Sequence, residues 1–244
     1  MLYKYVGSSN PEDTINYLKY FLEDGTIRAS DPFTFNDPSE FKIDLDLRAD
    51  KDTARKRFIK DRPNDTHFES WFRGLEQAKW SIITDSRQQI MSMYGVICLT
   101  PKPDNYLMWS HYAASHTGFC IGFDEKFLET IEDIELAGYV NYSEDVPVFS
   151  FFSEKPEDFS DKIVFSKHTC WAYEVEYRAV TSSQGIKKFD KSHIKEVILG
   201  SHVPYEVEQY VRNFLDSNIK IYKMASPFNT YSLKKVEVTS DVFF

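Results

Sequence analysis

The pattern of hydrophobic and polar positions predicts a strand, a helix and a second strand at the start of the chain. Leu2–Val6 has the pattern of a short strand. Asn10 then precedes Pro11 and two acidic residues, which is typical of the first turn of a helix. Gly25 marks the end of that helix, and Thr26–Ala29 follows as a brief strand.

Helical spacing dominates the middle of the chain. Between residues 49 and 93, apolar side chains recur every three or four positions, which predicts helices that bury one face. The side chains that we expect in the core there are Phe68, Trp71, Phe72, Leu75, Ala78 and Ile82. Continuous apolar runs at Val96–Thr100 and Gly118–Phe123 predict buried strands. Asp104 is expected to cap a helix that runs to about Ser115 between them.

The remainder of the chain predicts mainly strands. Extended segments are expected at residues 137–142, 172–181, 195–199, 219–224 and 232–239, and a helix at residues 204–216. Pro147–Asp161 has too many prolines and charges for a strand, so we expect a surface loop there, with a lid as one interpretation. Strands at both ends around a helical middle predict an α+β fold with a mixed or largely antiparallel sheet. We expect one domain, residues 1–244, with a helical insertion at about residues 44–93.

Charge and cysteine content narrow the partners and the compartment. The chain of 244 residues has a net charge of −9, so it lacks a general attraction to nucleic acid or anionic membranes. It shows neither a membrane-spanning apolar run nor the apolar stretch of a signal peptide. Cys98, Cys120 and Cys170 are far apart among apolar neighbours, which indicates buried, reduced thiols. We expect a soluble, cytoplasmic protein.

The segment Trp171–Arg178 concentrates charge among aromatic residues. As a strand, it would place Glu174, Glu176 and Arg178 together on one face. Two carboxylates beside a guanidinium could form a reactive site, because like charges raise one pKa and the guanidinium lowers it again. The same pattern fits an ordinary solvated strand face. The residues alone leave both interpretations open.

The segment Met108–Asp124 carries two histidines. Helical spacing places His111 near the core side, where a neutral imidazole bonded to a backbone carbonyl is the alternative to a functional role. His116 is expected at the helix end, where the partial negative charge favours imidazolium. The two side chains do not share a helical face, so no metal is expected. The chain lacks Walker, GxGxxG and GxSxG motifs, which argues against P-loop, Rossmann and α/β-hydrolase chemistry.

Six motifs spread over nearly the whole chain together resemble a known family. They are LYKY at Leu2–Tyr5, FNDPSE at Phe35–Glu40, the apolar strand Val96–Thr100, MWSHYA at Met108–Ala113, the segment His116–Asp124 and WAYEVEYR at Trp171–Arg178. In this order they resemble the bacterial domain of unknown function 2971. Ser39 stands where that family often has phenylalanine, and residues 44–93 match no pattern of it. The family's name leaves the function open.

A weaker resemblance is to ADP-ribosyltransferase-like folds, in which a helix is followed by a glycine, as in LEDGTI at Leu22–Ile27. Taken by order along the chain, this resemblance implies three motifs. The first is Tyr3, Lys4 and Tyr5, the middle one is Ser110, His111 and Tyr112, and the last is Glu174 and Glu176. The histidine or arginine that usually leads the first motif is absent, and Lys4 is the nearest basic residue.

This second resemblance implies roles for these residues. The catalytic residues would be Glu174, Glu176 and His111. NAD, as a co-substrate, would be bound by Tyr3, Lys4, Tyr5, Ser110, Tyr112 and Arg178. The late glutamate would orient the nicotinamide ribose and the acceptor, while aromatic side chains would enclose the nicotinamide ring.

Three functional hypotheses follow. The first is an NAD-consuming ADP-ribosyltransferase-like enzyme, a transferase or a glycohydrolase, in bacterial conflict or phage defence. The second is a non-catalytic sensor or interaction module that binds through the aromatic residues Phe149, Phe151, Phe152 and Phe159. The third is a metal-dependent hydrolase or nuclease built on His111, His116 and the glutamate pair. The acceptor, small or macromolecular, and the oligomeric state are not defined by the sequence.

Overall fold

The computed structural model of the chain describes residues 1–215 and 217–239, and its elements form two compact units. Unit 1 consists of residues 1–30, 95–139 and 172–244, and unit 2 of residues 31–94 and 140–171. The α+β class is confirmed, because helices combine with mixed and antiparallel sheets. The single domain with an insertion at about residues 44–93 stays a prediction. Unit 2 joins that helical region to residues 140–171.

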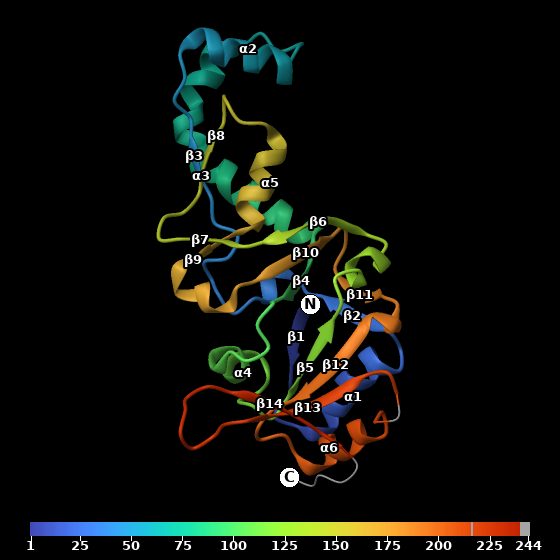
Figure 1. Cartoon of the computed structure of the whole chain (residues 1–244). Helices are drawn as coiled ribbons and strands as arrows, with labels where there is room; N and C mark the ends of the chain where they lie inside the picture. The colour runs from blue at the N-terminus through green and yellow to red at the C-terminus, as the bar shows by residue number, and fades with distance from the viewer. Residues whose placement is uncertain (216, 240–244) are drawn as a thin grey trace. The chain divides into compact units, whose positions relative to one another are not determined.

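Unit 1 is built on a five-stranded mixed sheet (Figure 1). Its strands, in spatial order, are β1 (Leu2–Val6), β5 (Phe119–Phe123), β12 (Ile194–Leu199), β13 (Lys220–Ala225) and β14 (Lys234–Glu237). Strands β12 and β13 run parallel, and the other neighbours are antiparallel. The strands predicted for these regions are thereby confirmed, with shifts of one or two residues at their ends.

Two smaller antiparallel sheets complete unit 1. One has the order β4 (Gly95–Leu99), β10 (Tyr177–Thr181) and β6 (Ile134–Tyr139), and the other pairs β2 (Thr26–Ala29) with β11 (Gly185–Lys188). An isolated bridge between Tyr3 and Thr100 joins β1 to the end of β4. The N-terminal strand β1 therefore lies beside the chain segment between β4 and helix α4 (Tyr106–Tyr112).

Both faces of the five-stranded sheet are covered, which explains the continuous apolar runs of its central strands. Helices α1 (Pro11–Leu22) and α6 (Tyr205–Arg212) pack with one set of strand residues, including Phe119 and Ile121 of β5. Helix α4 (Tyr106–Tyr112) packs with the alternate set, including Cys120. As predicted, Asn10 caps α1 by accepting a hydrogen bond from the main-chain nitrogen of Glu12. Short 3₁₀ turns, η2 (Phe127–Thr130) and η4 (Lys191–His193), connect strands.

Unit 2 is largely helical. Its elements are η1 (Pro32–Thr34), β3 (Asp44–Asp46), α2 (Lys51–Asp61), α3 (Phe68–Met93), β7 (Asn141–Ser143), β8 (Val148–Ser150), α5 (Pro156–Val164) and β9 (Ser166–His168). Strand β3 pairs with β8, and β7 with β9, both in parallel. The helical prediction for residues 49–93 is confirmed, and Phe68 and Leu75 are buried as expected. Although α3 has 26 residues, none of the helices within the described ranges is both long and apolar enough to cross a membrane.

The prediction of a surface loop at residues 147–161 is wrong, because strand β8 and helix α5 occupy most of this segment. Phe149 is buried and meets Phe159 edge-on, with ring centroids 5.2 Å apart. Phe152 meets Trp71 of α3 in the same manner at 6.2 Å. Phe149 therefore lies in the interior of unit 2, whereas Phe151, Phe152 and Phe159 are half-buried. The interaction-module hypothesis stays a prediction.

Candidate active site

Helix α4 is fixed in place by Asn105, one residue after the predicted cap Asp104. The side-chain oxygen of Asn105 accepts hydrogen bonds from the main-chain nitrogens of Leu107 and Met108, at 2.9 and 3.1 Å. Its side-chain nitrogen donates to the main-chain oxygen of Tyr173 at 2.9 Å. One side chain therefore starts the helix and also ties it to the acidic segment, residues 173–178. The helix ends at Tyr112, three residues before the predicted end.

Residues 173–176 of the acidic segment are not part of a strand, although a strand was predicted over residues 172–181. Thr169–Glu174 forms a 3₁₀ helix, η3, and β10 begins only at Tyr177. Val175 has a φ of 46°, in the left-handed region that residues other than glycine rarely adopt. Thr100 donates its hydroxyl to the main-chain oxygen of Glu174 at 2.6 Å. Side chains, rather than a neighbouring strand, thus bind the carbonyls of Tyr173 and Glu174.

The three charged side chains of the acidic segment are buried, which contradicts the interpretation of a solvated strand face. Glu174, Glu176 and Arg178 are 2%, 4% and 0% exposed. A buried charge costs several kcal/mol unless it is paired and hydrogen-bonded, so roughly this much would be lost if the partners were removed. The positions of these partners therefore decide what the segment can do.

Glu176 and Arg178 form a two-pronged ion pair. Nε of Arg178 donates to Oε1 of Glu176 at 2.9 Å, and one terminal nitrogen donates to Oε2 at 3.0 Å. This geometry is the strongest that a guanidinium and a carboxylate can adopt, because two parallel hydrogen bonds share the charge. Both carboxylate oxygens of Glu176 are engaged. The pair is thus suited to anchoring the segment.

The Glu174 carboxylate contacts the end of α4. The hydroxyl of Tyr112, at the end of α4, donates to Oε1 of Glu174 at 2.5 Å. A short hydrogen bond is expected where the acceptor is ionised. It ties the Glu174 carboxylate to the end of α4 and fixes its direction.

His111 lies at the surface, not near the core side as predicted, and is exposed. Its Nδ1 lies 2.8 Å from the hydroxyl of Tyr173, and the two rings meet at 68° with centroids 6.0 Å apart. Tyr173 and Glu174 are neighbours in the chain, and so are His111 and Tyr112. The middle motif therefore contacts the last motif through Tyr112 and Glu174, and it contacts the residue before that motif through His111 and Tyr173.

The first implied motif, on β1, divides between the two faces of the sheet. Tyr3 and Tyr5 are buried against α4, where Tyr5 meets Trp109 edge-on at 5.1 Å and donates its hydroxyl to the main-chain oxygen of Lys102 at 2.7 Å. Burial raises the pKa of both phenols well above the usual value. Both tyrosines fill the core in this structure, and their role in binding a cofactor stays a prediction.

Lys4 alternates with the two tyrosines along β1. Its charge acts on Cys98 of β4, which stands opposite Arg178 in the β4–β10 register. Burial raises the pKa of the Cys98 thiol, the Glu176 carboxylate raises it further, and the Lys4 ammonium partly opposes them. The thiol therefore stays protonated at neutral pH, and the role of Lys4 in binding stays a prediction.

Ser110 and His116 lie on the side of α4 that carries Tyr106. The Ser110 hydroxyl donates to the main-chain oxygen of Tyr106 at 2.9 Å and lies 3.3 Å from Nε2 of His116. The prediction that His116 is an imidazolium is wrong, because its pKa is lowered and not raised. Burial, and secondarily the neighbouring His202, lower the pKa of His116, which favours the neutral ring. Binding of a cofactor by Ser110 stays a prediction.

The metal hypothesis lacks a set of ligands. Among residues 1–215 and 217–239, no three His, Cys, Asp or Glu side chains lie close enough together to hold a metal ion. The cysteines do not add a reactive pair either. Cys120 is buried, which raises its pKa, whereas Cys170 is exposed, contrary to the prediction of three buried thiols.

Sequence reasoning missed three residues that shape this site. Asn105 and Thr100 bind the carbonyls of the acidic segment, and Tyr173 contacts His111. Only Asn105 carried a signal, since asparagine before an apolar periodic segment is a common helix cap. The other two act across more than 60 residues of sequence.

Comparison with known proteins supports the family resemblance. It does not point to any catalytic class. The model of a protein family of unknown function (DUF2971) matches residues 108–179. The resemblance to this family is therefore confirmed over the segment that contains most of α4, His116 and the acidic residues. Neither the curated proteins nor the solved structures include a match to the chain. The resemblance to ADP-ribosyltransferase-like folds thus receives no support from these comparisons.

Proposed function

We propose that the protein is an enzyme that cleaves NAD between the ribose and nicotinamide and passes the ADP-ribosyl group to water or to an acceptor. The observation that carries this proposal is the 2.5 Å hydrogen bond between Tyr112 and Glu174. It joins the middle and last motifs that the resemblance to ADP-ribosyltransferases implies. The bridge from Tyr3 to Thr100, whose hydroxyl binds the Glu174 carbonyl, connects the first motif to the same cluster.

In this proposal Glu174 is the reactive carboxylate. The bond from ribose C1′ to the nicotinamide nitrogen breaks, its electron pair leaves with nicotinamide, and positive charge develops on the ribose. A carboxylate in a site shielded from water stabilises such a charge strongly, and Glu174 is only 2% exposed. Tyr112 holds the carboxylate in one orientation. Water or an acceptor hydroxyl then bonds to C1′ and releases its proton.

Glu176 and His111 receive supporting roles. Because both oxygens of Glu176 accept hydrogen bonds from Arg178, we assign this pair to positioning the segment that carries Glu174. The exposed His111 and the half-buried Tyr173 form an edge-on aromatic pair, which offers a ring face to nicotinamide. Ser110 and Lys4 complete the proposed set around the substrate.

We place this activity in the bacterial cytoplasm, in conflict or phage defence. The three cysteines are free thiols, which suits a reducing compartment. Loss of NAD deprives a cell of a central cofactor, so an enzyme that consumes it would serve such a purpose. The net charge of −9 argues against nucleic acid as the acceptor.

The test is nicotinamide release from NAD by the purified protein. We expect Glu174→Gln to release nicotinamide about 100- to 1000-fold more slowly than the wild type, the usual loss when one group that stabilises a transition-state charge is removed. The matched control is Glu237→Gln, which changes an exposed glutamate on β14 and should keep the wild-type rate.

Two results would contradict the proposal. Release at background level by the wild type, with no change of melting temperature on adding NAD, overturns the activity itself. Equal release by the wild type and Glu174→Gln overturns the role of Glu174. Circular dichroism of both variants shows whether a lost activity reflects a lost fold.

A further inference from the structure

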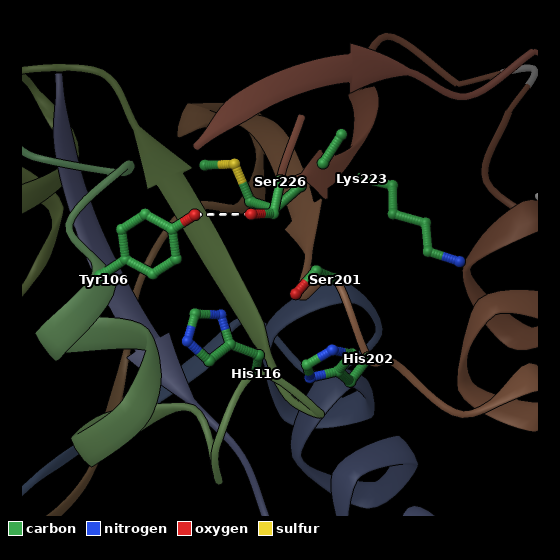
Figure 2. Close-up of a pocket in the computed structure, with 8 residues that line it drawn as sticks. Tyr106, His116, Ser201, His202, Lys223 and Ser226 are labelled. Carbon is green, nitrogen blue, oxygen red and sulfur yellow. Dashed lines mark hydrogen bonds between the residues drawn. The ribbon is translucent and has the colours of Figure 1, made fainter. Parts of the chain in front are cut away.

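Unit 1 contains a polar cavity that the proposed reaction does not use. It measures about 500 Å³ and opens between α4, the residues that follow β12 and the end of β13. The polar side chains that line it are Tyr106, His116, Ser201, His202, Lys223 and Ser226 (Figure 2). We call it the histidine pocket.

The backbone that carries His116 into the histidine pocket is strained. Ala114, Ser115 and His116 have φ values of 46°, 55° and 70°, three left-handed residues in succession and none of them glycine. Each such residue is energetically unfavourable and persists only where the surrounding structure enforces it. Strain of this kind concentrates at binding sites and active sites.

Close backbone packing enforces this conformation. The main-chain nitrogen of His202 donates to the main-chain oxygen of His116 at 3.0 Å, and that of Gly200 donates to the oxygen of Gly118 at 2.9 Å. A Cβ atom on Gly200 would collide with the His116 oxygen, and one on Gly118 with the oxygen of Val6. The loop that carries His116 is therefore clamped between the ends of β1 and β12.

The imidazole of His116 is held with one nitrogen unsatisfied. Its ring stacks on Trp109, with centroids 6.3 Å apart and an angle of 16°, and its Nε2 lies 3.3 Å from the Ser110 hydroxyl. Nδ1 is shielded from solvent and has no hydrogen-bond partner within the described part of the chain. In Figure 2 the ring lies below the hydrogen bond between Tyr106 and Ser226. A shielded polar atom without a partner calls for an explanation, and a bound ligand supplies one.

The polar groups of the histidine pocket favour an anion. Hydroxyls and imidazoles line it, and none of the described lining residues is acidic. The hydroxyls of Tyr106 and Ser226 lie 2.7 Å apart, so either can turn towards a ligand. The Lys223 ammonium is turned away from these groups and pairs with Glu208 at 2.9 Å (Figure 2). Hydroxyl and imidazole donors of this kind match the oxygens of a phosphate.

We propose that the histidine pocket binds the phosphate group of a small phosphorylated molecule. In the complex, His116 is protonated, so that its Nδ1 and the hydroxyls of Ser201 and Ser226 donate to phosphate oxygens and the imidazolium supplies the positive charge. This goes beyond the proposed cleavage of NAD and does not depend on it. Helix α4 presents Tyr112 to Glu174 and Tyr106 to the histidine pocket, so one helix serves both places.

The experiment is a titration of the full chain with inorganic phosphate, followed through the imidazole carbon-bound protons by NMR. We expect saturable shifts of the His116 and His202 signals, while His67, which is exposed on unit 2, serves as an internal reference. Ser226→Ala should weaken phosphate binding about tenfold, the value of one hydrogen bond to a charged group. Ser92→Ala, at an exposed serine near the end of α3, is the matched control.

The named outcomes separate this proposal from the cleavage of NAD. Shifts at His116 and His202 that are no larger than at His67, or equal affinity in Ser226→Ala and wild type, overturn it. Adenosine monophosphate should displace phosphate, and failure to do so refutes a pocket for phosphorylated molecules. Glu174→Gln should bind phosphate as the wild type does, whether or not nicotinamide is released.

Discussion

The acidic segment and the histidine pocket satisfy their polar groups in opposite ways. In the acidic segment, Glu176 is bonded twice to Arg178, and Glu174 accepts from Tyr112. In the histidine pocket, a shielded nitrogen of His116 has no partner in the described residues. The first cluster is completed by the protein itself, whereas the second has hydrogen-bonding capacity left for a ligand.

The difference follows from burial and charge. Glu174, Glu176 and Arg178 are nearly inaccessible to water, so each charge needs a partner for the fold to be stable. The histidine pocket is lined by exposed groups such as His202 and Ser226, which water can satisfy while the pocket is empty. Substitutions in the Glu176–Arg178 pair should therefore act mainly on stability, and substitutions in the histidine pocket mainly on binding.

The largest effect is expected from breaking the buried ion pair. Arg178→Met should lower the free energy of unfolding by about 3–5 kcal/mol, because Glu176 is left charged and buried. Glu176→Leu combined with Arg178→Met should recover most of this loss, since apolar groups of similar volume then replace both charges. Urea unfolding of the two variants and the wild type measures both values.

Arg48 and Asp46 provide the matched control, because they form a pair with the same spacing and the same two hydrogen bonds at the surface. The Arg48 side chain is 87% exposed, so water replaces its partner and Arg48→Met should leave the unfolding curve unchanged. A loss in Arg178→Met as small as that in Arg48→Met would contradict the idea that burial sets the difference.

The next effect tests whether the histidine pocket is rigid before a ligand binds. Gly200→Ala places a Cβ against the main-chain oxygen of His116 and should cost about 1–3 kcal/mol through overpacking. Gly74→Ala is the control, because nothing lies within 4 Å of its Cβ position on α3. Alanine there should stabilise the protein by about 0.5–1 kcal/mol. Equal unfolding midpoints for the two variants would show that the His116 loop is not clamped.

Local signals in the sequence were sufficient where an element depends on its own residues. Leu2–Val6, the cap at Asn10 and the apolar runs of β4 and β5 were predicted and are confirmed. Prediction failed where distant groups decide. The strand pattern of residues 172–176 is overridden by Thr100 and Asn105, which bind the carbonyls of the acidic segment.

The candidate sites show the same division. Glu174, Tyr112 and His111 could be selected from the sequence because they stand in compact motifs. Their pairing could not, because it depends on where α4 ends and on the left-handed Val175. The histidine pocket draws its lining from four separate stretches of chain. One of them follows β12 and carries His202, whose main-chain nitrogen donates to the main-chain oxygen of His116. No spacing rule connects such residues before the fold is known.

The smallest effect is a dependence of stability on pH that belongs to the histidine pocket. Burial lowers the pKa of His116 in the folded protein, whereas the unfolded chain has a histidine pKa of about 6.5. Below that value the unfolded state binds more protons, so the free energy of unfolding should fall as the pH falls from neutrality towards the folded pKa. His116→Gln should flatten this slope, and His67→Gln, at the surface of unit 2, should keep it. Identical slopes in all three proteins would show that the ring of His116 is not held neutral by its surroundings. Added phosphate should reduce this loss of stability at low pH in the wild type and in His67→Gln but not in His116→Gln, because a bound anion favours the imidazolium that the empty pocket disfavours.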